Sequence, residues 1–220
     1  MPRWYDEIAA ALAGHGLIAR GAFHPEPADG APPETGTLLL AGNAGPAMWR
    51  AFTTARPTGP DPLDSWCSAA LTAVAARFAA VLLLPSDGPP YHPFQRWAMR
   101  AGNVFRSPLG ILIDPEYGLW HGYRGAFAFA DRRDLPPRRA RDNPCDGCAG
   151  RPCLSACPVA AFGADGYDVP ACAAHLASAA GVDCMTGGCG ARRACPVGRD
   201  HVFAPAQAEF HMRAFLAARN

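Results

Sequence analysis

The first 130 residues carry hydrophobic patterns that are typical of helices. Apolar residues recur at helical spacing across residues 4–13, and acidic residues fall in the first turn, where they favour the helix dipole. Three further helices are predicted at residues 46–54, 66–78 and 93–100. Proline opens the first of these three, and Asp64 with Ser65 is the expected cap of the second.

Short apolar runs between these helices predict strands. The run at residues 36–42 is bounded by glycines and indicates a buried strand. Three more strands are predicted at residues 79–84, 109–113 and 126–130. This mixture of elements predicts an α/β or α+β domain over residues 1–130, a normal domain size.

The remaining 90 residues follow a different pattern. Residues 131–144 are charged and contain prolines, which predicts a linker; the alternative is a docking patch for an acidic redox partner. Residues 145–204 are rich in cysteine and predict a second, small domain. Residues 205–220 contain the pattern of a terminal amphipathic helix.

Composition narrows the class of protein. Half of the residues are hydrophobic, which excludes wholesale disorder, and the net charge of +1 argues against a nucleic-acid partner. The N-terminus lacks the apolar core of a secretory signal, and the longest apolar run, residues 79–85, is too short to cross a bilayer. Nine cysteines in such a chain indicate bound metal or iron–sulfur in a reducing compartment. We therefore expect a cytoplasmic protein without a membrane partner.

Eight of the nine cysteines form an internal repeat. The first half has the spacing Cys-x2-Cys-x4-Cys-x3-Cys-Pro and the second Cys-x11-Cys-x4-Cys-x5-Cys-Pro, and both end in Ala-Cys-Pro-Val. In bacterial ferredoxins one loop supplies three thiolates to a [4Fe–4S] cluster, and the cysteine before proline binds the other cluster. The repeat therefore predicts a ferredoxin-like module with two [4Fe–4S] clusters, although its loops are longer than those of ferredoxins.

Crossed ligation assigns every cysteine of the repeat to one of two clusters. The first cluster is predicted at Cys145, Cys148, Cys153 and Cys195. The second is predicted at Cys157, Cys172, Cys184 and Cys189. Two tetrahedral zinc sites are the alternative, but zinc knuckles come as paired Cys-x2-Cys motifs and this chain has one such pair.

Glycines and aromatic residues are concentrated in residues 103–125. Glycines such as Gly110 and Gly118 let the backbone approach a flat ligand, whose amide arms their N–H groups are expected to bind. Leu109, Ile111 and Trp120 are expected to form an apolar floor for that ligand. The alternative is an ordinary tight hairpin with structural glycines and core aromatics.

Four short motifs, in this order along the chain, are Ala-Gly-Pro-Ala-Met at 44–48, Asp-Pro-Leu-Asp at 61–64, Tyr-His-Pro at 91–93 and the segment 110–125. Together they resemble the cobalamin-binding domain shared by CblC cobalamin-processing proteins, epoxyqueuosine reductases and reductive dehalogenases. The cysteine module is similar to that of epoxyqueuosine reductases, in which a cobalamin domain precedes a two-cluster domain. The resemblance implies a nitroreductase-like fold that binds cobalamin, or alternatively FMN or FAD, next to a dicluster ferredoxin-like domain.

The same resemblance implies which residues contact the cofactor. They are His92, Asn103, Ser107, Leu109, Gly110, Ile111, Asp114, Tyr117, Gly118, Trp120 and Arg124. Asp114 departs from the family pattern, which has histidine there, so the role of that imidazole is lost or changed.

Arg124 and Tyr117 are the candidate catalytic residues. Arg124 is expected to hold a phosphate or carboxylate arm; the alternative is an ion pair with Asp114 or Glu116. Tyr117, like Tyr91 and Tyr123, is a possible proton donor.

Three further side chains have simpler structural interpretations. His92 and His121 are more often hydrogen-bonded structural histidines than cobalt ligands, and Cys67 is most simply a small buried side chain.

Three functions remain open at this stage. The first is a reductase that reduces cobalamin cobalt and removes its upper axial ligand, as in decyanation. The second is a cobalamin-dependent reductase of an outside organic compound, similar to epoxyqueuosine reductase or a dehalogenase. The third is an electron carrier whose first domain holds flavin or docks a partner. Each needs an external low-potential electron donor, of the flavodoxin or ferredoxin reductase type.

Overall fold

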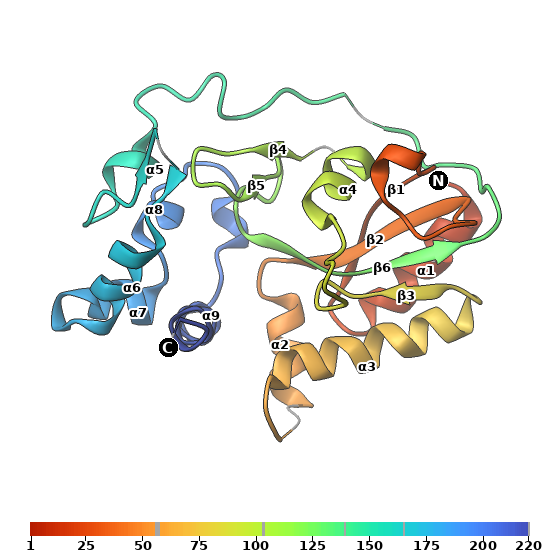
Figure 1. Cartoon of the computed structure of the whole chain (residues 1–220), viewed down its shortest axis with the longest axis horizontal. Coiled ribbons are helices and arrows are strands. Elements are labelled where there is room, and N and C mark those ends of the chain that lie inside the picture. The colour runs from red at the N-terminus through yellow and green to blue at the C-terminus, as the bar shows by residue number, and fades with distance from the viewer. Residues whose placement is uncertain (56–57, 103, 139, 165, 220) are drawn as a thin grey trace. The chain divides into compact units, whose positions relative to one another are not determined.

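The computed structural model describes residues 1–55, 58–102, 104–138, 140–164 and 166–219 (Figure 1). The chain forms two compact units. Unit 1 comprises Met1–Asn103 and His121–Ala140, and unit 2 comprises Val104–Trp120 and Arg141–Asn220. The segment 104–120 therefore lies with the cysteine-rich region, whereas the sequence-based division placed it in the first domain.

Unit 1 is built on a four-stranded antiparallel sheet with strand order β1-β2-β6-β3. Its strands are β1 (Ile18–Phe23), β2 (Thr37–Ala44), β3 (Val81–Leu83) and β6 (His121–Phe129). The predicted strands at 36–42 and 79–84 are confirmed. The strand predicted at 126–130 begins five residues earlier, at His121, because β6 pairs with β2 over its whole length.

Four α-helices surround this sheet. They are α1 (Arg3–Ala13), α2 (Ala47–Thr54), α3 (Pro62–Arg77) and α4 (Phe94–Ala101), and a 3-10 turn spans Pro27–Asp29. All four were predicted from the apolar spacing. The predicted cap of α3 is wrong, because this helix begins at Pro62, after Asp61, and Asp64 already lies in its first turn.

Strand β2 forms the centre of unit 1 and is buried along nearly its whole length. Adjacent side chains of a strand point to opposite faces of the sheet, so both faces must be covered. Helix α3 contacts β3 and β6, and α4 contacts β1 and β2. In Figure 1, α3 runs along one side of the sheet and α4 lies on the other. The resulting core holds β6 rigidly, and β6 carries Arg124.

Unit 2 consists mainly of short elements, and four of its described α-helices contain a cysteine or directly follow one. Its strands are β4 (Phe105–Arg106), β5 (Leu112–Ile113), β7 (Phe162–Gly163) and β8 (Gly166–Tyr167). Its α-helices are α5 (Pro152–Ser155), α6 (Val169–Ala177), α7 (Val182–Gly187), α8 (Gly190–Arg193) and α9 (Pro205–Ala217). 3-10 turns occupy Ala179–Gly181 and Arg199–His201. Helix α9 confirms the predicted terminal helix and contacts α6 and α7.

The segment 104–120 is joined to the rest of unit 2 through close backbone contact. A Cβ atom at Gly118 would lie 2.1 Å from the carbonyl oxygen of Val197, and one at Gly198 would lie 2.3 Å from the carbonyl carbon of Tyr117. The Arg192 guanidinium also donates to the Leu119 carbonyl, at 2.9 Å from Nε. Residues 117–119 and 192–198 therefore pack as one structural element.

Candidate iron–sulfur centre and arginine pocket

Four cysteines of unit 2 line a single recess. They are Cys145, Cys148, Cys153 and Cys195. The other lining side chains are mostly apolar and include Pro108, Ile113, Pro144, Pro152 and Val197. These four cysteines are the set that crossed ligation assigns to the first cluster, and we call them the first group.

The path of the chain explains why a cysteine from the second half of the repeat joins this group. Helix α5 carries Cys153, and Cys195 lies two residues after the end of α8. These two short helices contact each other. The second half of the repeat therefore delivers its last cysteine to the loop formed by the first half.

The remaining four cysteines of the repeat also lie close to one another. Cys172 interacts electrostatically with Cys157 and Cys184, and Cys189 interacts with Cys172 and Cys184. Cys157, Cys172, Cys184 and Cys189 are called the second group below. Because Cys157 comes from the first half of the repeat, this group is also a crossed one.

Two thiols in each group have raised pKa values. Burial is the main cause for Cys145 and Cys153, and the neighbouring Cys195 thiol raises their pKa further. Burial also raises the pKa of Cys172 and Cys189. Thiols with raised pKa values are protonated at neutral pH, so binding of iron would release protons from them.

Four thiols that line one recess are the donor set of either a tetrahedral zinc site or an iron–sulfur cube. A tetrahedral zinc site requires four thiolates about 2.3 Å from one ion. Among the described residues, no three or more His, Cys, Asp or Glu side chains are arranged to hold one metal ion. In a four-iron cube, in contrast, each thiolate binds its own iron atom.

The predicted cofactor segment packs beside the first group. Leu109, Ile113 and Leu119 form a buried cluster with Cys195, and Cys145 and Cys153 pack against it. Ile111, in contrast, is 40 % exposed. Trp120 belongs to a separate buried cluster with Phe203 and Ala208. Leu109, Ile111 and Trp120 therefore do not form one floor within unit 2, and that prediction is wrong.

A half-buried cation lies over Trp120. The Arg192 guanidinium lies 4.6 Å from the Trp120 ring and 4.5 Å from the Phe203 ring. Burial lowers the pKa of Arg192 to about 10, so the side chain stays charged at neutral pH, and the nearby Cys189 thiol opposes this shift. This arginine was not predicted as part of the site, because the many arginines of the chain do not distinguish it.

The backbone of residues 107–118 uses its N–H groups within its own turns. The Gly110 N–H donates to the backbone carbonyl of Ser107 at 3.1 Å, and the Gly118 N–H donates to the backbone carbonyl of Asp114 at 2.8 Å. The predicted use of these two N–H groups for amide arms of a cofactor is therefore wrong. The Ser107 hydroxyl donates to the Ile111 carbonyl at 2.7 Å, and the Asp114 carboxylate accepts from the backbone of Glu116 and Tyr117. The alternative of a tight hairpin with structural glycines describes this segment.

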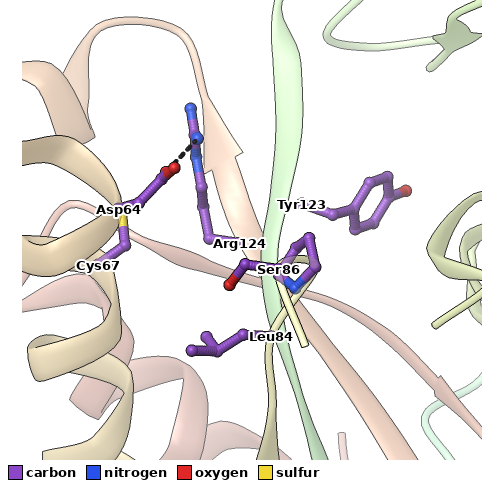
Figure 2. A pocket seen from close by; sticks show the side chains of 7 residues that line it. Asp64, Cys67, Leu84, Ser86, Tyr123 and Arg124 are labelled. Carbon is purple, nitrogen blue, oxygen red and sulfur yellow. Dashed lines mark ion pairs between the residues drawn. The ribbon is translucent and has the colours of Figure 1, made fainter. Parts of the chain in front are cut away.

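Unit 1 contains a separate pocket around Arg124. Its lining residues are Asp64, Cys67, Leu84, Pro85, Ser86, Tyr123 and Arg124. Figure 2 shows Arg124 and Tyr123 leaving β6 toward opposite sides, as adjacent strand residues do, with Arg124 directed toward Asp64 on α3. The pocket thus combines a cation, a carboxylate, a thiol and a hydroxyl.

Arg124 is held by two neighbours and retains donors for a ligand. Its Nε donates to Asn43 Oδ1 at 3.1 Å, and one terminal nitrogen lies 3.9 Å from an Asp64 carboxylate oxygen. The predicted alternative of a pair with Asp114 or Glu116 stays a prediction, because those two residues belong to unit 2. A guanidinium has five N–H donors, so this arrangement leaves some of them for an anionic group.

Cys67 is buried, as predicted, at 2 % exposure. Burial raises the pKa of its thiol to about 11, although the Arg124 charge opposes this shift. The Cys67 thiol therefore lines the pocket as an uncharged group.

The other predicted residues are divided between the units. In unit 1, the His92 ring lies 5.2 Å from that of Trp97, and His121 Nδ1 lies 3.2 Å from Arg20. In unit 2, the Tyr117 ring meets that of His201 edge-on at 4.8 Å. Asn103 lies outside the described residues. Cofactor contact and proton donation by these residues stay predictions.

Comparison with known proteins shows which solved structures have a similar fold. No family model matches the chain, and no curated protein matches it. The structure resembles epoxyqueuosine reductase from Bacillus subtilis, with 13 % identity and a TM-score of 0.56 over 92 % of this chain and 67 % of that one. The Streptococcus thermophilus enzyme gives 15 % identity and a TM-score of 0.51 over 94 % and 68 % of the two chains.

A third similar structure is an epoxyqueuosine reductase with an epoxyqueuosine-modified tRNA stem loop, at 12 % identity and a TM-score of 0.55 over 92 % and 67 %. At such identities the likeness establishes a shared fold. The chain thus has a mixed α/β fold of the epoxyqueuosine reductase kind, which spans both of its units. None of the described helices combines the length and hydrophobicity needed to span a membrane.

Proposed function

We propose that this protein is an iron–sulfur oxidoreductase that uses a corrinoid to reduce a small organic substrate. The observation that carries this proposal is the gathering of eight cysteines, from two interleaved halves of a repeat, into two groups of four. The fold shared with epoxyqueuosine reductases supports it, because that likeness covers the cysteine region as well as unit 1.

The two cysteine groups are proposed to hold two [4Fe–4S] clusters. Such clusters, when bound, supply single electrons at low potential. The protein contributes the thiolates, and the apolar side chains of Pro108, Ile113 and Val197 exclude water from the first group. Exclusion of water and burial of charge are two of the means by which proteins set cluster potentials.

The Arg124 pocket is the proposed anchor for an anionic group of the cofactor or substrate. An arginine fixed by Asn43 presents its remaining donors in a set direction, which suits a carboxylate or phosphate. The pocket volume of about 270 Å³ holds a side arm or a small molecule, whereas a whole corrinoid is much larger. A corrinoid is therefore proposed from the resemblance of unit 1 and not from this pocket.

The substrate is proposed to be a small organic compound and not RNA. The net charge of +1 gives the chain little general attraction for a polyanion. An external low-potential donor, of the flavodoxin or ferredoxin reductase type, is proposed to supply the electrons.

Removal of the upper axial ligand of cobalamin is the second candidate function. It is favoured by the resemblance of residues 110–125 to CblC proteins, which includes Arg124. One-electron reduction of cobalt weakens its axial bonds, so the same electron supply would serve this reaction.

One series of measurements tests these proposals. The protein is purified without oxygen, its iron and acid-labile sulfide are counted, and its spectrum is recorded during titration with hydroxocobalamin, FMN and FAD. About eight iron atoms and a corrinoid-dependent spectral shift are expected. Zinc in place of iron would overturn the cluster proposal. If the clusters are present but no corrinoid binds, the corrinoid proposal is wrong and the protein is better described as an electron carrier. Reductive loss of cyanide from cyanocobalamin would favour the second candidate function.

A further inference from the structure

Unit 1 has a further pocket, where the end of β1 meets the segment that follows β6. Its volume is about 310 Å³, at the lower end of the range for small-molecule pockets. Arg100, Arg132 and Arg138 line it together with His24 and with apolar side chains such as Phe23. We call it the three-arginine pocket. All of its lining residues belong to unit 1, and none of them lines the Arg124 pocket.

Two of the three arginines come from the start of the predicted linker, which is bound to unit 1 by hydrogen bonds. The Thr37 hydroxyl donates to the Asp131 carbonyl at 2.8 Å and accepts from the Arg133 N–H at 2.8 Å. The Trp4 indole N–H donates to the Asp134 carbonyl at 2.9 Å. The start of the linker therefore has a fixed place beside the pocket.

A histidine orients one of these two arginines. His24 Nε2 lies 2.9 Å from the Arg133 carbonyl oxygen, which only accepts, so Nε2 carries the hydrogen. His24 Nδ1 is then the acceptor for the Arg132 guanidinium, at 2.9 Å. This bond sets the direction of the guanidinium and uses one of its five N–H donors. The remaining donors are left for a ligand.

The positive charges of the pocket are only partly balanced by carboxylates. Arg100 lies 3.2 Å from a Glu26 oxygen and 3.3 Å from an Asp29 oxygen, so these groups neutralise one another. Arg132 and Arg138 are exposed, and neither forms an ion pair with a carboxylate among the described residues. Two guanidiniums without a counter-charge in one pocket attract an anion.

We propose that the three-arginine pocket binds the phosphate group of a small phosphorylated compound. One guanidinium satisfies both oxygens of a carboxylate through paired N–H donors, whereas a phosphate group has three terminal oxygens for more than one arginine. Phe23 and Leu135 give the pocket an apolar side for the rest of the ligand. The site requires neither the clusters nor the corrinoid, so this inference goes beyond the proposed function.

The test is isothermal titration calorimetry of the full chain, purified without oxygen, at constant ionic strength and in a buffer without phosphate. The probes are phenyl phosphate, inorganic phosphate and benzoate, which has the ring but carries a carboxylate. We expect both phosphate probes to bind, and phenyl phosphate to bind at least about tenfold more tightly than benzoate. Absence of binding by both phosphate probes would overturn the inference, and so would equal affinities for phenyl phosphate and benzoate.

Two variants with a matched control locate the site. Arg132→Gln and Arg138→Gln each remove one guanidinium and should weaken binding of phenyl phosphate about tenfold or more. Arg138 has no ion pair among the described residues, so its replacement should not disturb packing. Arg3→Gln removes the same charge from unit 1 at a side chain that is 92 % exposed and outside the pocket, so it should keep the affinity. Equal weakening in all three variants would show general charge attraction and overturn the inference.

The variant Arg124→Gln separates this site from the anion anchor of the proposed function. Probe binding that Arg124→Gln leaves unchanged and Arg132→Gln weakens would support the three-arginine pocket. If Arg124→Gln abolishes binding and Arg132→Gln has no effect, the probe binds in the Arg124 pocket and this inference is wrong. A protein without iron and sulfide would overturn the proposed clusters, whereas the calorimetry would still decide whether the phosphate site exists.

Discussion

At the scale of single residues, Cys67 is chemically different from the eight cysteines of the repeat. It lies on α3 in unit 1, at 2 % exposure, and burial raises the pKa of its thiol to about 11. Since the thiolate is the reactive form, both the low ionised fraction and the lack of access protect this side chain. Its raised pKa favours the folded state below about pH 9, and that advantage is lost as the pH rises toward 11.

We therefore predict that Cys67 resists alkylation in the native protein. At pH 8 its modification by iodoacetamide should be at least about a hundredfold slower than in urea, from the pKa shift alone. Peptide mapping by mass spectrometry measures the label at this one position. Equal rates in the native and the unfolded protein would show that the thiol is exposed.

Trp120, unlike Cys67, lies in an environment that differs from expectation. It is 2 % exposed, lies under the Arg192 guanidinium and packs with Phe203. Its indole N–H is buried without a partner among the described residues. Replacement of Trp120 should therefore change the stability of the fold before it changes any contact with a ligand.

Replacing this side chain should destabilise the fold. Trp120→Ala is expected to lower the free energy of unfolding by about 3–5 kcal/mol, because it leaves a large cavity. Trp120→Phe, which keeps a ring and removes an unpartnered donor, should cost less than half as much. Denaturant unfolding followed by circular dichroism compares the two; a cost near zero for Trp120→Ala would contradict the packing described above.

At the scale of elements, the contact between residues 117–119 and 192–198 determines whether the segment 104–120 stays with unit 2. Gly118 and Gly198 both have positive φ, and each would place a Cβ atom within 2.3 Å of the other segment. Val197 directly follows the Cys195-Pro196 pair. A displacement here would therefore also move a ligand of the first group.

This contact gives a prediction with a matched control. Gly118→Ala should destabilise the protein by about 2 kcal/mol or more and reduce iron content, because the new methyl group meets the Val197 carbonyl. Gly110 also has a positive φ of 75°, but nothing lies within 4 Å of a Cβ atom there. Gly110→Ala should therefore cost only about 1 kcal/mol and keep its iron. Equal iron contents in the two variants would argue against this coupling.

The elements also show how far sequence could predict this fold. Helices α1 to α4 were predicted from apolar spacing and helix-start signals, and strand β2 was predicted from an apolar run bounded by glycines. Strand β1 was missed, because Arg20 and Gly21 interrupt its short apolar run. Of the strand predicted at 109–113, only Leu112 and Ile113 form a strand. The Gly110 N–H donates to the Ser107 carbonyl and the Ser107 hydroxyl donates to the Ile111 carbonyl, so the preceding residues form a turn.

The candidate site was predictable to a similar degree. Spacing and repetition predicted which cysteines would gather, since these follow from chain connectivity. The burial and the neighbours of Leu109, Ile111 and Trp120 depend on long-range packing, which local sequence patterns do not reveal.

At the scale of the whole molecule, the two halves of the cysteine repeat are interleaved. Cys195 lines the recess of the first group, and Cys157 interacts with members of the second. A module without this exchange would bind one cluster through each half independently. Loss of the cysteine before proline would then affect the cluster of its own half, whereas in the interleaved module it affects the cluster bound mainly by the other half.

Single replacements of the two cysteines that precede proline distinguish these arrangements. In the interleaved module, Cys195→Ser should alter the same electron paramagnetic resonance signal as Cys145→Ser, although 50 positions separate them in the sequence. Cys157→Ser should alter the signal that Cys184→Ser alters. Each variant should lose up to half of the iron and keep the other signal. If Cys195→Ser instead alters the Cys184→Ser signal, each half binds its own cluster, and the contact of α5 with α8 joins two independent sites.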